Sequence, residues 1–422
     1  MRAPLSILAS FATTAAAAEL HVGEGKEHVT IRAALTAANA GDSVTVHAGT
    51  YAEGNLVIDK PITLRGKNRP VVDGGGKSEV FTITAPDVTL SGFAVRRSGS
   101  GSLEDLAGIK VSGTQRATVT GNEVSDCHFA IYVSKSKDCL VSANRIAGTP
   151  RGEQDTGNGI HLWSCERVRV EDNSIRHHRD GIYLEFASAS HIERNTVEDC
   201  LRYGLHYMFS HESVYTLNTF RRNGAGVAVM YSRKVEMSRN RFARNWGSSS
   251  YGLLLKDMTD GTISGNDFDS NSTGIAVHGS NRMTIEGNRF ANNGWAIQVE
   301  GSSSDNVYRN NNFTGNSFDV AAEANVDSNR FENNHWQKYE GYDLRRDGSG
   351  DVPHRPVGLY SVVVDRVPPA VLLLRSPIVH LLDQAEKAFP TITPERVIDE
   401  SPAMKPHPFS LPDPIPTKTP PP

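Results

Sequence analysis

Two short motifs recur in phase along most of this chain, and they constrain its fold more than any other feature. The first is Asn-x-apolar, found at Asn122-Val124, Asn144-Ile146, Asn173-Ile175, Asn195-Val197, Asn218-Phe220, Asn240-Phe242, Asn266-Phe268, Asn288-Phe290, Asn311-Phe313 and Asn329-Phe331. The second is a small residue followed by an apolar one, found at Gly108-Ile109, Ala130-Ile131, Gly159-Ile160, Gly181-Ile182, Gly204-Leu205, Gly226-Val227, Gly252-Leu253, Gly274-Ile275 and Ala296-Ile297. Most steps are 22 or 23 residues long in both series, so one elongated repeat domain can absorb most of the chain.

The residues between the markers alternate apolar and polar in both halves of each unit, as in GIAVHGSNRMTIEGNRF from 274 to 290. Leucine-rich repeats have a similar period, but half of each of their units is a Leu-rich convex segment. Alternation in both halves predicts two or three short strands per turn instead. We therefore expect an all-β fold, a single-stranded right-handed parallel β-helix (a pectin-lyase-like solenoid), over residues 19–335. The recurring Asn suits its corners, because Asn tolerates a left-handed backbone and its amide can bond the next Asn above.

Both ends of the repeat carry other signals. Residues 1–18, MRAPLSILASFATTAAAA, have one Arg, a short apolar middle and an Ala-rich end, which predicts a secretory signal peptide and export. The segment from Ile31 to Asn39 has helical spacing, with Thr30 as its N-cap and Gly41 as its stop. We expect this helix to cap the N-terminal coil, which would otherwise expose core and unpaired backbone.

The repeat pattern is lost after residue 335. Residues 336–390 form an extension with an apolar run, Val371 to Leu374, and a predicted short helix from about Pro377 to Phe389 that is apolar along one side. Two roles stay open for it: a cap on the C-terminal end of the stack, or a dock on a membrane protein. Residues 391–422 are Pro-rich, and we expect them to be disordered.

Charge and cysteine content narrow the function classes. The net charge is −4 and the basic residues are scattered, so no nucleic-acid partner is predicted. Beyond the signal, no stretch reaches the ~20 uninterrupted apolar residues of a transmembrane helix. Cys127, Cys139, Cys165 and Cys200 lack CxxC spacing, which leaves disulfides and buried free thiols equally open.

Alternation also assigns side chains to faces. If Leu205, Val227 and Leu253 point inward, the residues between the inward positions form outward columns. One column is Trp163, Glu185, Met208, Met230, Lys256 and His278, and its neighbour is Tyr132, His161, Tyr183, His206, Ala228 and Leu254. Met208 and Met230 would lie one rung apart, at ~4.8 Å between backbones, with His206 about 7 Å from Met208 along the strand.

Two thioethers and an imidazole form a soft ligand set that suits Cu(I). The predicted metal ligands are therefore His206, Met208 and Met230, with His161 and Glu185 as further candidates and copper bound only transiently. The alternative is an apolar surface patch for a protein partner.

The same phasing assigns the other Met and His residues. Met237 and Met283 fall in inward columns and are expected in the core, whereas His211 lies at a corner and is left undecided. His177 and His178 sit in a turn, where we expect ordinary solvated histidines.

Parallel β-helices often act on polysaccharides, so a carbohydrate-active enzyme is a further alternative. Glycoside hydrolysis needs two acids ~5 to 9.5 Å apart. Glu185 with Asp180 and Arg179 is the nearest approach, and the sequence holds no NTD, GHG or RIK set of the polygalacturonase kind and no DPHE motif of the alginate epimerase kind. Since a fold alone does not confer activity, we expect no enzyme here.

The sequence resembles the NosD family, the exported maturation factors of nitrous oxide reductase. The matching segments are DGIYLEF (180–186), RYGLHYMFSHES (202–213), NGAGVAVMYSRKVEM (223–237), NWGSSSYGLLLKD (245–257) and NGWAI (293–297). GDSVTVHAGTY (41–51), KPITLRG (60–66) and HRPVGLYSVVVDRVPPAVLLLRSP (354–377) also match, so the resemblance covers nearly all of the mature chain.

The resemblance implies a non-catalytic protein of the periplasm. It would work with the membrane subunit of an ABC-type transporter, docked through the C-terminal extension, and with a copper chaperone lipoprotein. Its task would be to deliver copper, with or without sulfur species, to apo nitrous oxide reductase for the copper–sulfide centre. His206, Met208 and Met230 lie inside the matching motifs, so the copper role carries over to them as a hypothesis. A docking scaffold that binds no metal is the alternative.

Overall fold

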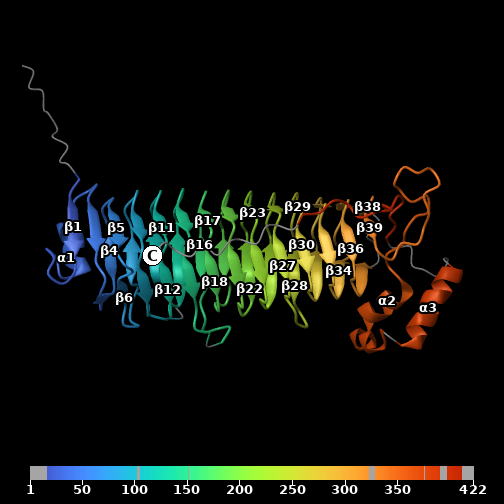
Figure 1. Ribbon diagram of the computed structural model, residues 1–422, viewed down its shortest axis with the longest axis horizontal. Helices are drawn as coiled ribbons and strands as arrows, with labels where there is room; N and C mark the ends of the chain where they lie inside the picture. Colours follow the sequence, from blue (N-terminus) through green and yellow to red (C-terminus); the bar gives the residue numbers. More distant parts are fainter. Residues whose placement is uncertain are drawn as a thin grey trace, which may run out of the picture.

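Three parallel β-sheets run the length of the molecule in a computed structural model that describes residues 17–101, 105–150, 152–322, 328–374, 376–389 and 397–410. Figure 1 shows the resulting rod, with the first coils in blue at one end and the helices of the C-terminal extension at the other. The strands of each coil enter the sheets in turn, and each strand pairs in parallel with those one coil earlier and later. The predicted right-handed parallel β-helix is confirmed.

The three sheets have 14, 12 and 13 strands. The 14-stranded sheet contains β1 (Glu19–Val22), β2 (Ser43–Val46), β5 (Thr63–Gly66), β8 (Thr89–Ser91), β11 (Thr118–Thr120), β14 (Leu140–Ser142), β17 (Arg169–Glu171), β20 (His191–Glu193), β23 (Val214–Thr216), β26 (Glu236–Ser238), β29 (Thr262–Ser264), β32 (Thr284–Glu286), β35 (Val307–Arg309) and β38 (Arg330–Glu332). The 12-stranded sheet contains β4 (Leu56–Ile58), β7 (Phe81–Ile83), β10 (Ala107–Ser112), β13 (Phe129–Ser134), β16 (Ile160–Trp163), β19 (Ile182–Glu185), β22 (Tyr203–Met208), β25 (Ala225–Met230), β28 (Tyr251–Lys256), β31 (Thr273–His278), β34 (Trp295–Val299) and β37 (Phe318–Ala322). The 13-stranded sheet contains β3 (Thr50–Tyr51), β6 (Val71–Asp73), β9 (Ala94–Arg96), β12 (Glu123–Ser125), β15 (Arg145–Ala147), β18 (Ser174–Arg176), β21 (Thr196–Glu198), β24 (Thr219–Arg221), β27 (Arg241–Ala243), β30 (Asp267–Asp269), β33 (Arg289–Ala291), β36 (Asn312–Thr314) and β39 (His335–Trp336).

The recurring Asn residues form a continuous internal ladder at one corner. After the first member, each carboxamide oxygen accepts hydrogen bonds from the backbone N–H and the side-chain NH₂ of the Asn one coil earlier, as between Asn218 and Asn240 at 3.0 Å. Its members are Asn122, Asn144, Asn173, Asn195, Asn218, Asn240, Asn266, Asn288, Asn311 and Asn334. Because buried amides without partners are costly, this ladder fixes the stacking of the coils.

The prediction that Asn329 is the last member of this ladder is wrong. Asn334 occupies the position, because it lies one full coil of 23 residues after Asn311. Asn329 accepts a hydrogen bond from Asn306 in a separate, shorter ladder. A third ladder, which the sequence did not reveal, runs through Asn223, Asn245, Asn271, Asn293 and Asn316.

Apolar side chains fill the interior in columns. The aromatic residues that follow the Asn ladder stack along the axis with ring centroids 4.1–5.7 Å apart, and they are Phe220, Phe242, Phe268, Phe290, Phe313 and Trp336. Leu205, Val227 and Leu253 are fully buried in the 12-stranded sheet, as the alternation predicted. The side chains between the inward positions therefore belong to the outer surface of that sheet.

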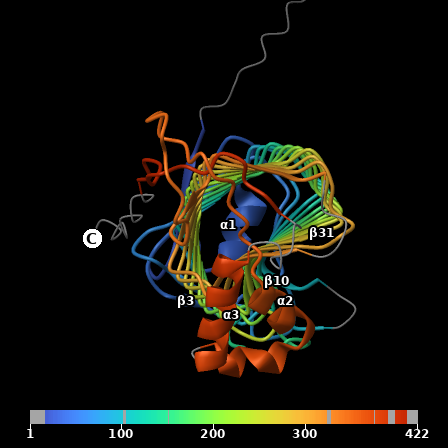
Figure 2. The same cartoon turned by 90° about the vertical axis from the view of Figure 1, so that its right-hand side faces the viewer.

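The N-terminal end is closed by helix α1 (Ile31–Ala37), as predicted. The Thr30 side chain caps it by accepting a hydrogen bond from the Ala33 N–H at 3.2 Å, and Ile31, Ala34 and Leu35 are buried. Figure 2, which looks along the rod, shows α1 within the outline of the coils. The predicted signal peptide falls on residues 1–18, of which 1–16 lie outside the described residues.

Among its described residues, the C-terminal extension holds two α-helices and a 3-10 helix rather than the one predicted helix. They are α2 (Leu359–Arg366), η1 (Pro368–Leu373) and α3 (Pro377–Ala388), and α3 matches the prediction. Tyr360 and Val364 of α2 pack with Val379 of α3 against Phe318 of β37, so the helices attach to the side of the last coils. No helix of the described residues is both long and apolar enough to cross a bilayer.

A returning segment closes the C-terminal end of the rod instead. Asp399 is fully buried, and its carboxylate accepts hydrogen bonds from the backbone N–H of Asn333 and of Asn334, from the Asn334 NH₂ and from the Trp336 indole. Asp399 also forms β-bridges with Phe331 and His354. The predicted disorder of residues 391–422 is therefore wrong for 397–410, because Asp399 satisfies donors that the last coil leaves open; residues 391–396 and 411–422 lie outside the described residues.

Candidate functional site

The predicted ligands lie on adjacent rungs of the outer surface of the 12-stranded sheet. In the strand register, Met208 of β22 pairs with Met230 of β25 and with Glu185 of β19. His206 lies two residues before Met208 and pairs with Tyr183 of β19. Residues far apart along the chain are thus surface neighbours in the predicted order.

His206 differs from the expectation in one respect: it points outward but is only 4% exposed. The Tyr183 ring stacks on it at 4.5 Å between centroids, and the Tyr203 ring packs at 4.8 Å. Aromatic neighbours rather than the β-helix interior cover it. The burial restricts access and excludes water from the imidazole.

The orientation of His206 is set by Asp180, a fully buried carboxylate that precedes β19. Nδ1 of His206 lies 3.3 Å from Oδ2 of Asp180, and Oδ1 of Asp180 accepts the backbone N–H of Tyr203 at 3.2 Å. Because a carboxylate oxygen accepts, this contact favours the Nδ1–H tautomer of a neutral His206 ring, in which Nε2 carries the lone pair. Nε2 is buried without a hydrogen-bond partner, so its lone pair is not committed to another protein group.

The two thioethers are more accessible than the imidazole. Met208 and Met230 are both half-buried, and Met230 packs against the apolar surface of Ala228, Leu254 and Ala276. The Met208 sulfur accepts a hydrogen bond from the Tyr183 hydroxyl at 3.5 Å. The set therefore offers one imidazole and two polarizable sulfurs on neighbouring strands.

His161 and Glu185, the further candidates, are placed differently. His161 Nε2 lies 3.9 Å from Glu185 Oε2, and its Nδ1 lies 3.5 Å from the Asn158 amide. Burial, with a contribution from Arg179, lowers the pKa of His161 to about 3, so the ring is neutral at ordinary pH. Burial also raises the pKa of Glu185, while nearby His206 lowers it. In the strand register Glu185 lies one coil before Met208 and His161 lies two coils before His206, so these two residues extend the outer row away from Met230.

The donor chemistry favours a soft cation. Across the part of the chain that the structure describes, no three His, Cys, Asp or Glu side chains gather as a metal site. Zinc and calcium sites normally need such clusters. Thioether and imidazole donors suit Cu(I), so the residues present fit that ion.

An exposed aromatic strip borders the site. Phe186, Phe209 and Tyr231 directly follow Glu185, Met208 and Met230 at the strand ends, and their rings stack at 5.4 and 5.0 Å. Their φ angles are 52°, 50° and 51°, a left-handed conformation that bulky residues rarely adopt. The corresponding corners of the neighbouring coils hold Ser164 and Asp257.

Several other predicted assignments can now be settled. Met237 and Met283 are fully buried, as expected, and His211 is half-buried at its corner. The expectation of a solvated His178 is wrong: the ring is buried, its Nδ1 faces the Gly157 carbonyl at 3.2 Å, and burial lowers its pKa to about 4. The loop before β16 covers it, and a sequence pattern cannot reveal that cover. His177, with φ 59°, is only half-buried.

The four cysteines are free and buried, which resolves the open choice between bridges and thiols in the described residues. Burial raises the pKa of Cys127 to about 11 and those of Cys165 and Cys200 to about 12, so these thiols stay protonated. Neutral buried thiols are poor metal ligands, and we assign them to the core.

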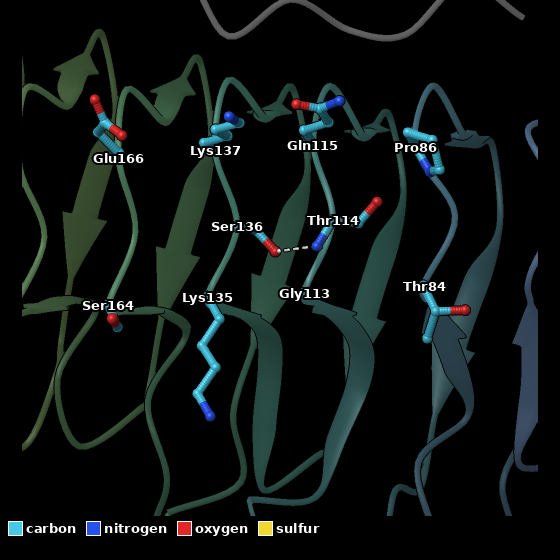
Figure 3. Close-up of a pocket in the computed structure, with 10 residues that line it drawn as sticks. All are labelled: Thr84, Pro86, Gly113, Thr114, Gln115, Lys135, Ser136, Lys137, Ser164 and Glu166. Atoms are coloured by element: carbon cyan, nitrogen blue, oxygen red, sulfur yellow. Dashed lines mark hydrogen bonds between the residues drawn. The ribbon is translucent and has the colours of Figure 1, made fainter.

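A shallow groove of about 540 Å³ lies elsewhere on the rod, near the N-terminal coils. Figure 3 shows its polar lining, in which the Thr114 N–H donates to Ser136 Oγ and the Lys135 and Lys137 side chains point apart. Its lining includes none of the predicted ligands. The groove has no convergent set of donors and is separate from the candidate site.

Structures that resemble this chain share its architecture. The catalytic unit of an α-1,3-glucanase from Streptomyces thermodiastaticus superposes with a TM-score of 0.58 and 17% identity, over 71% of this chain and 63% of the glucanase. The adhesin PfbA of Streptococcus pneumoniae gives 0.57 and 14%, over 71% of this chain and 94% of the adhesin. At such low identity these similarities show the fold alone.

Sequence comparisons are more specific. A family profile described as periplasmic copper-binding protein (NosD) matches residues 151–342, the stretch that contains the candidate ligands. A probable ABC transporter binding protein NosD of Pseudomonas aeruginosa is 36% identical over 377 residues, covering 85% of this chain and 87% of the relative. A protein of the same description from Stutzerimonas stutzeri is 33% identical over 378 residues, covering 85% and 86%. This chain therefore belongs to the NosD family of periplasmic copper-binding proteins.

Proposed function

We propose that this protein carries copper, as Cu(I), on His206, Met208 and Met230 and passes it on for assembly of the copper–sulfide centre of nitrous oxide reductase. The observation that carries the proposal is the buried, unpartnered Nε2 of His206 beside a register-paired couple of methionines. Whether sulfur species travel with the metal belongs to the same proposal. Export through the signal peptide at residues 1–18 would place the protein in the periplasm.

The ligand set suits transient binding rather than permanent storage. Thioethers are neutral and bind Cu(I) through polarizable sulfur, so they need no deprotonation and release the ion without taking up a proton. Both sulfurs are half-buried at the outer surface, where the ligands of another protein can approach them. Copper is therefore cargo here.

The C-terminal helices supply a docking surface for the membrane subunit of an ABC-type transporter. Val379 and Leu382 of α3 pack inward, whereas other large apolar side chains of the helices are exposed. Leu372 is 87% exposed, Leu381 66% and Ile378 57%. Apolar patches of this kind on exported proteins mark protein or membrane contacts.

The candidate copper ligands and the attachment point of the C-terminal helices lie on the same sheet. The helices attach at β37, four rungs beyond β25 in the order of the 12-stranded sheet, which is about 19 Å along the axis. Membrane association would thus come through the partner. A copper chaperone lipoprotein as donor and apo nitrous oxide reductase as acceptor would meet the same outer surface.

The acids near the site argue against an enzyme. Asp180 is fully buried and committed to His206 and Tyr203, so it has no free oxygen for proton transfer to a substrate. The pair Glu185 and Asp180 therefore does not supply the two free acids that glycoside hydrolysis requires. This supports a non-catalytic role.

Competitive titration with a chromophoric Cu(I) chelator tests the proposal. The triple variant H206A/M208A/M230A should bind Cu(I) at least about 100-fold more weakly, because all three soft donors are lost. The control M237L/M283L changes two core methionines and should keep the wild-type affinity. Equal affinity of the triple variant would remove the copper site and leave a docking scaffold. Release of reducing ends or unsaturated uronates from polysaccharides would instead indicate an enzyme.

A further inference from the structure

Tyr183 is held between the two histidines of the outer row. It lies on β19 directly across from His206, and their rings stack at 4.5 Å with an interplanar angle of 14°. On its other side the His161 ring centroid lies 4.7 Å away. The Tyr183 residue is only 8% exposed, so the ring has little freedom to move.

The hydroxyl of Tyr183 ends at the candidate metal site. It donates to the Met208 sulfur at 3.5 Å, although a thioether is among the weakest acceptors in proteins. The group on the sulfur is therefore a hydrogen-bond donor.

We propose that Tyr183 sets the affinity of the site, by holding the Met208 sulfur in the metal-free protein and weakening it as a ligand for Cu(I). The inference rests on the proposed function. Cu(I) binds through a lone pair of the same sulfur to which the hydroxyl donates. The ion must displace that hydrogen bond or share the sulfur with it, and no atom is oxidised or reduced.

The consequence concerns release as much as binding. When a partner withdraws the ion, the hydroxyl can take back the sulfur at once, because the stacked ring has not moved. A site with this internal competitor binds more weakly than its donor set alone would, as a cargo carrier requires. In the alternative role, the hydroxyl positions Met208 for the metal. The two roles predict opposite changes in Cu(I) affinity when the hydroxyl is removed.

The substitution Y183F removes the hydroxyl and keeps the stacked ring. We expect it to tighten Cu(I) binding by about 3- to 10-fold, the range for loss of one modest hydrogen bond from the free state. The matched control is Y132F, since Tyr132 lies in the same column but its hydroxyl donates to Asp105 at 3.0 Å. Y132F should leave the affinity unchanged. Unchanged or weaker binding by Y183F overturns the proposal.

A second measurement does not depend on metal. In protein labelled with ¹³C-methyl methionine, Y183F should shift the Met208 methyl resonance of the metal-free protein more than that of Met230, and an unmoved Met208 resonance would contradict the hydrogen bond. If H206A/M208A/M230A binds Cu(I) as tightly as the wild type, the proposed function fails. If that variant loses Cu(I) but Y183F does not gain affinity, only the role of Tyr183 fails.

Discussion

The inward and outward columns of the same coils obey one register but differ in kind. Inside, the position two residues after each ladder Asn holds Phe in five successive coils, and these rings stack from Phe220 to Phe313. Outside, the column of β19 to β28 reads Glu185, Met208, Met230, Lys256. The difference shows that the repeat constrains residue identity where a side chain packs on the equivalent side chain of the next coil. Residues on the outer surface can differ from coil to coil, so functional groups can be placed there.

The largest expected effect comes from truncating one inward and one outward side chain of the same coil and comparing the two losses of stability. F242A removes a fully buried ring stacked at 4.6 Å on Phe268 and should cost about 3–5 kcal/mol of unfolding free energy. M230A removes a half-buried side chain of the same coil and should cost no more than about 1 kcal/mol. Urea unfolding followed by circular dichroism measures both, and similar losses would contradict the division of roles.

The next effect concerns the outer surface alone. D180N keeps the shape of the side chain but allows an NH₂ group to face His206, which would move the imidazole proton to Nε2. We expect about 10- to 100-fold weaker Cu(I) binding, the usual range for loss of a partner that orients a ligating histidine.

Nitrogen NMR of His206 reports its tautomer and separates this effect from a general structural one. D172N, at an exposed corner, is the control and should change neither the tautomer nor the affinity. A D180N protein with an unchanged tautomer and full affinity would contradict the role of Asp180.

The sequence was sufficient for the parts of the molecule that repeat. Alternation placed Met208 beside Met230, and the Asn motif located the ladder, because both depend on a period that the chain displays. The contact of Asp180 with His206 and the role of Asp399 could not be found in this way. Asp180 precedes its strand in a single coil, and Asp399 meets Asn334 across 65 residues of chain without repeat. The metal site itself stays a prediction.

The buried histidines should make the stability of the protein depend on pH, a smaller effect than those above. Burial lowers the pKa of His178 and of His354 from 6.5 to about 4. Between about pH 6.5 and 4 the unfolded chain binds protons that the folded protein does not, so stability falls as pH is lowered through this window.

For His178 the loss should reach about 1–2 kcal/mol at pH 5 relative to pH 7.5. Urea unfolding at the two pH values measures it. H178N should show a smaller difference between them, whereas H191N, at an exposed position, should behave as the wild type. An unchanged pH dependence in H178N would exclude His178 as a source.

The smallest change is expected at the aromatic corner. F186S replaces the most exposed ring of the strip, at 53%, with the residue that the preceding coil carries at Ser164. Unfolding free energy should change by less than about 1 kcal/mol, because lost stacking is offset by relief of a bulky residue in the left-handed region. A loss as large as that of F242A would make the strip structural.

The amide ladder has a direction, because each of its Asn side chains both accepts and donates hydrogen bonds. Each Asn carboxamide takes hydrogen bonds from the coil before and offers its NH₂ to the coil after. At the C-terminal end of the ladder, Asp399 accepts hydrogen bonds from Asn334. Its side chain has no NH₂ group to donate to a further coil, so the ladder ends there. The length of the rod is thus fixed by chemistry, and two rods cannot join end to end through this ladder.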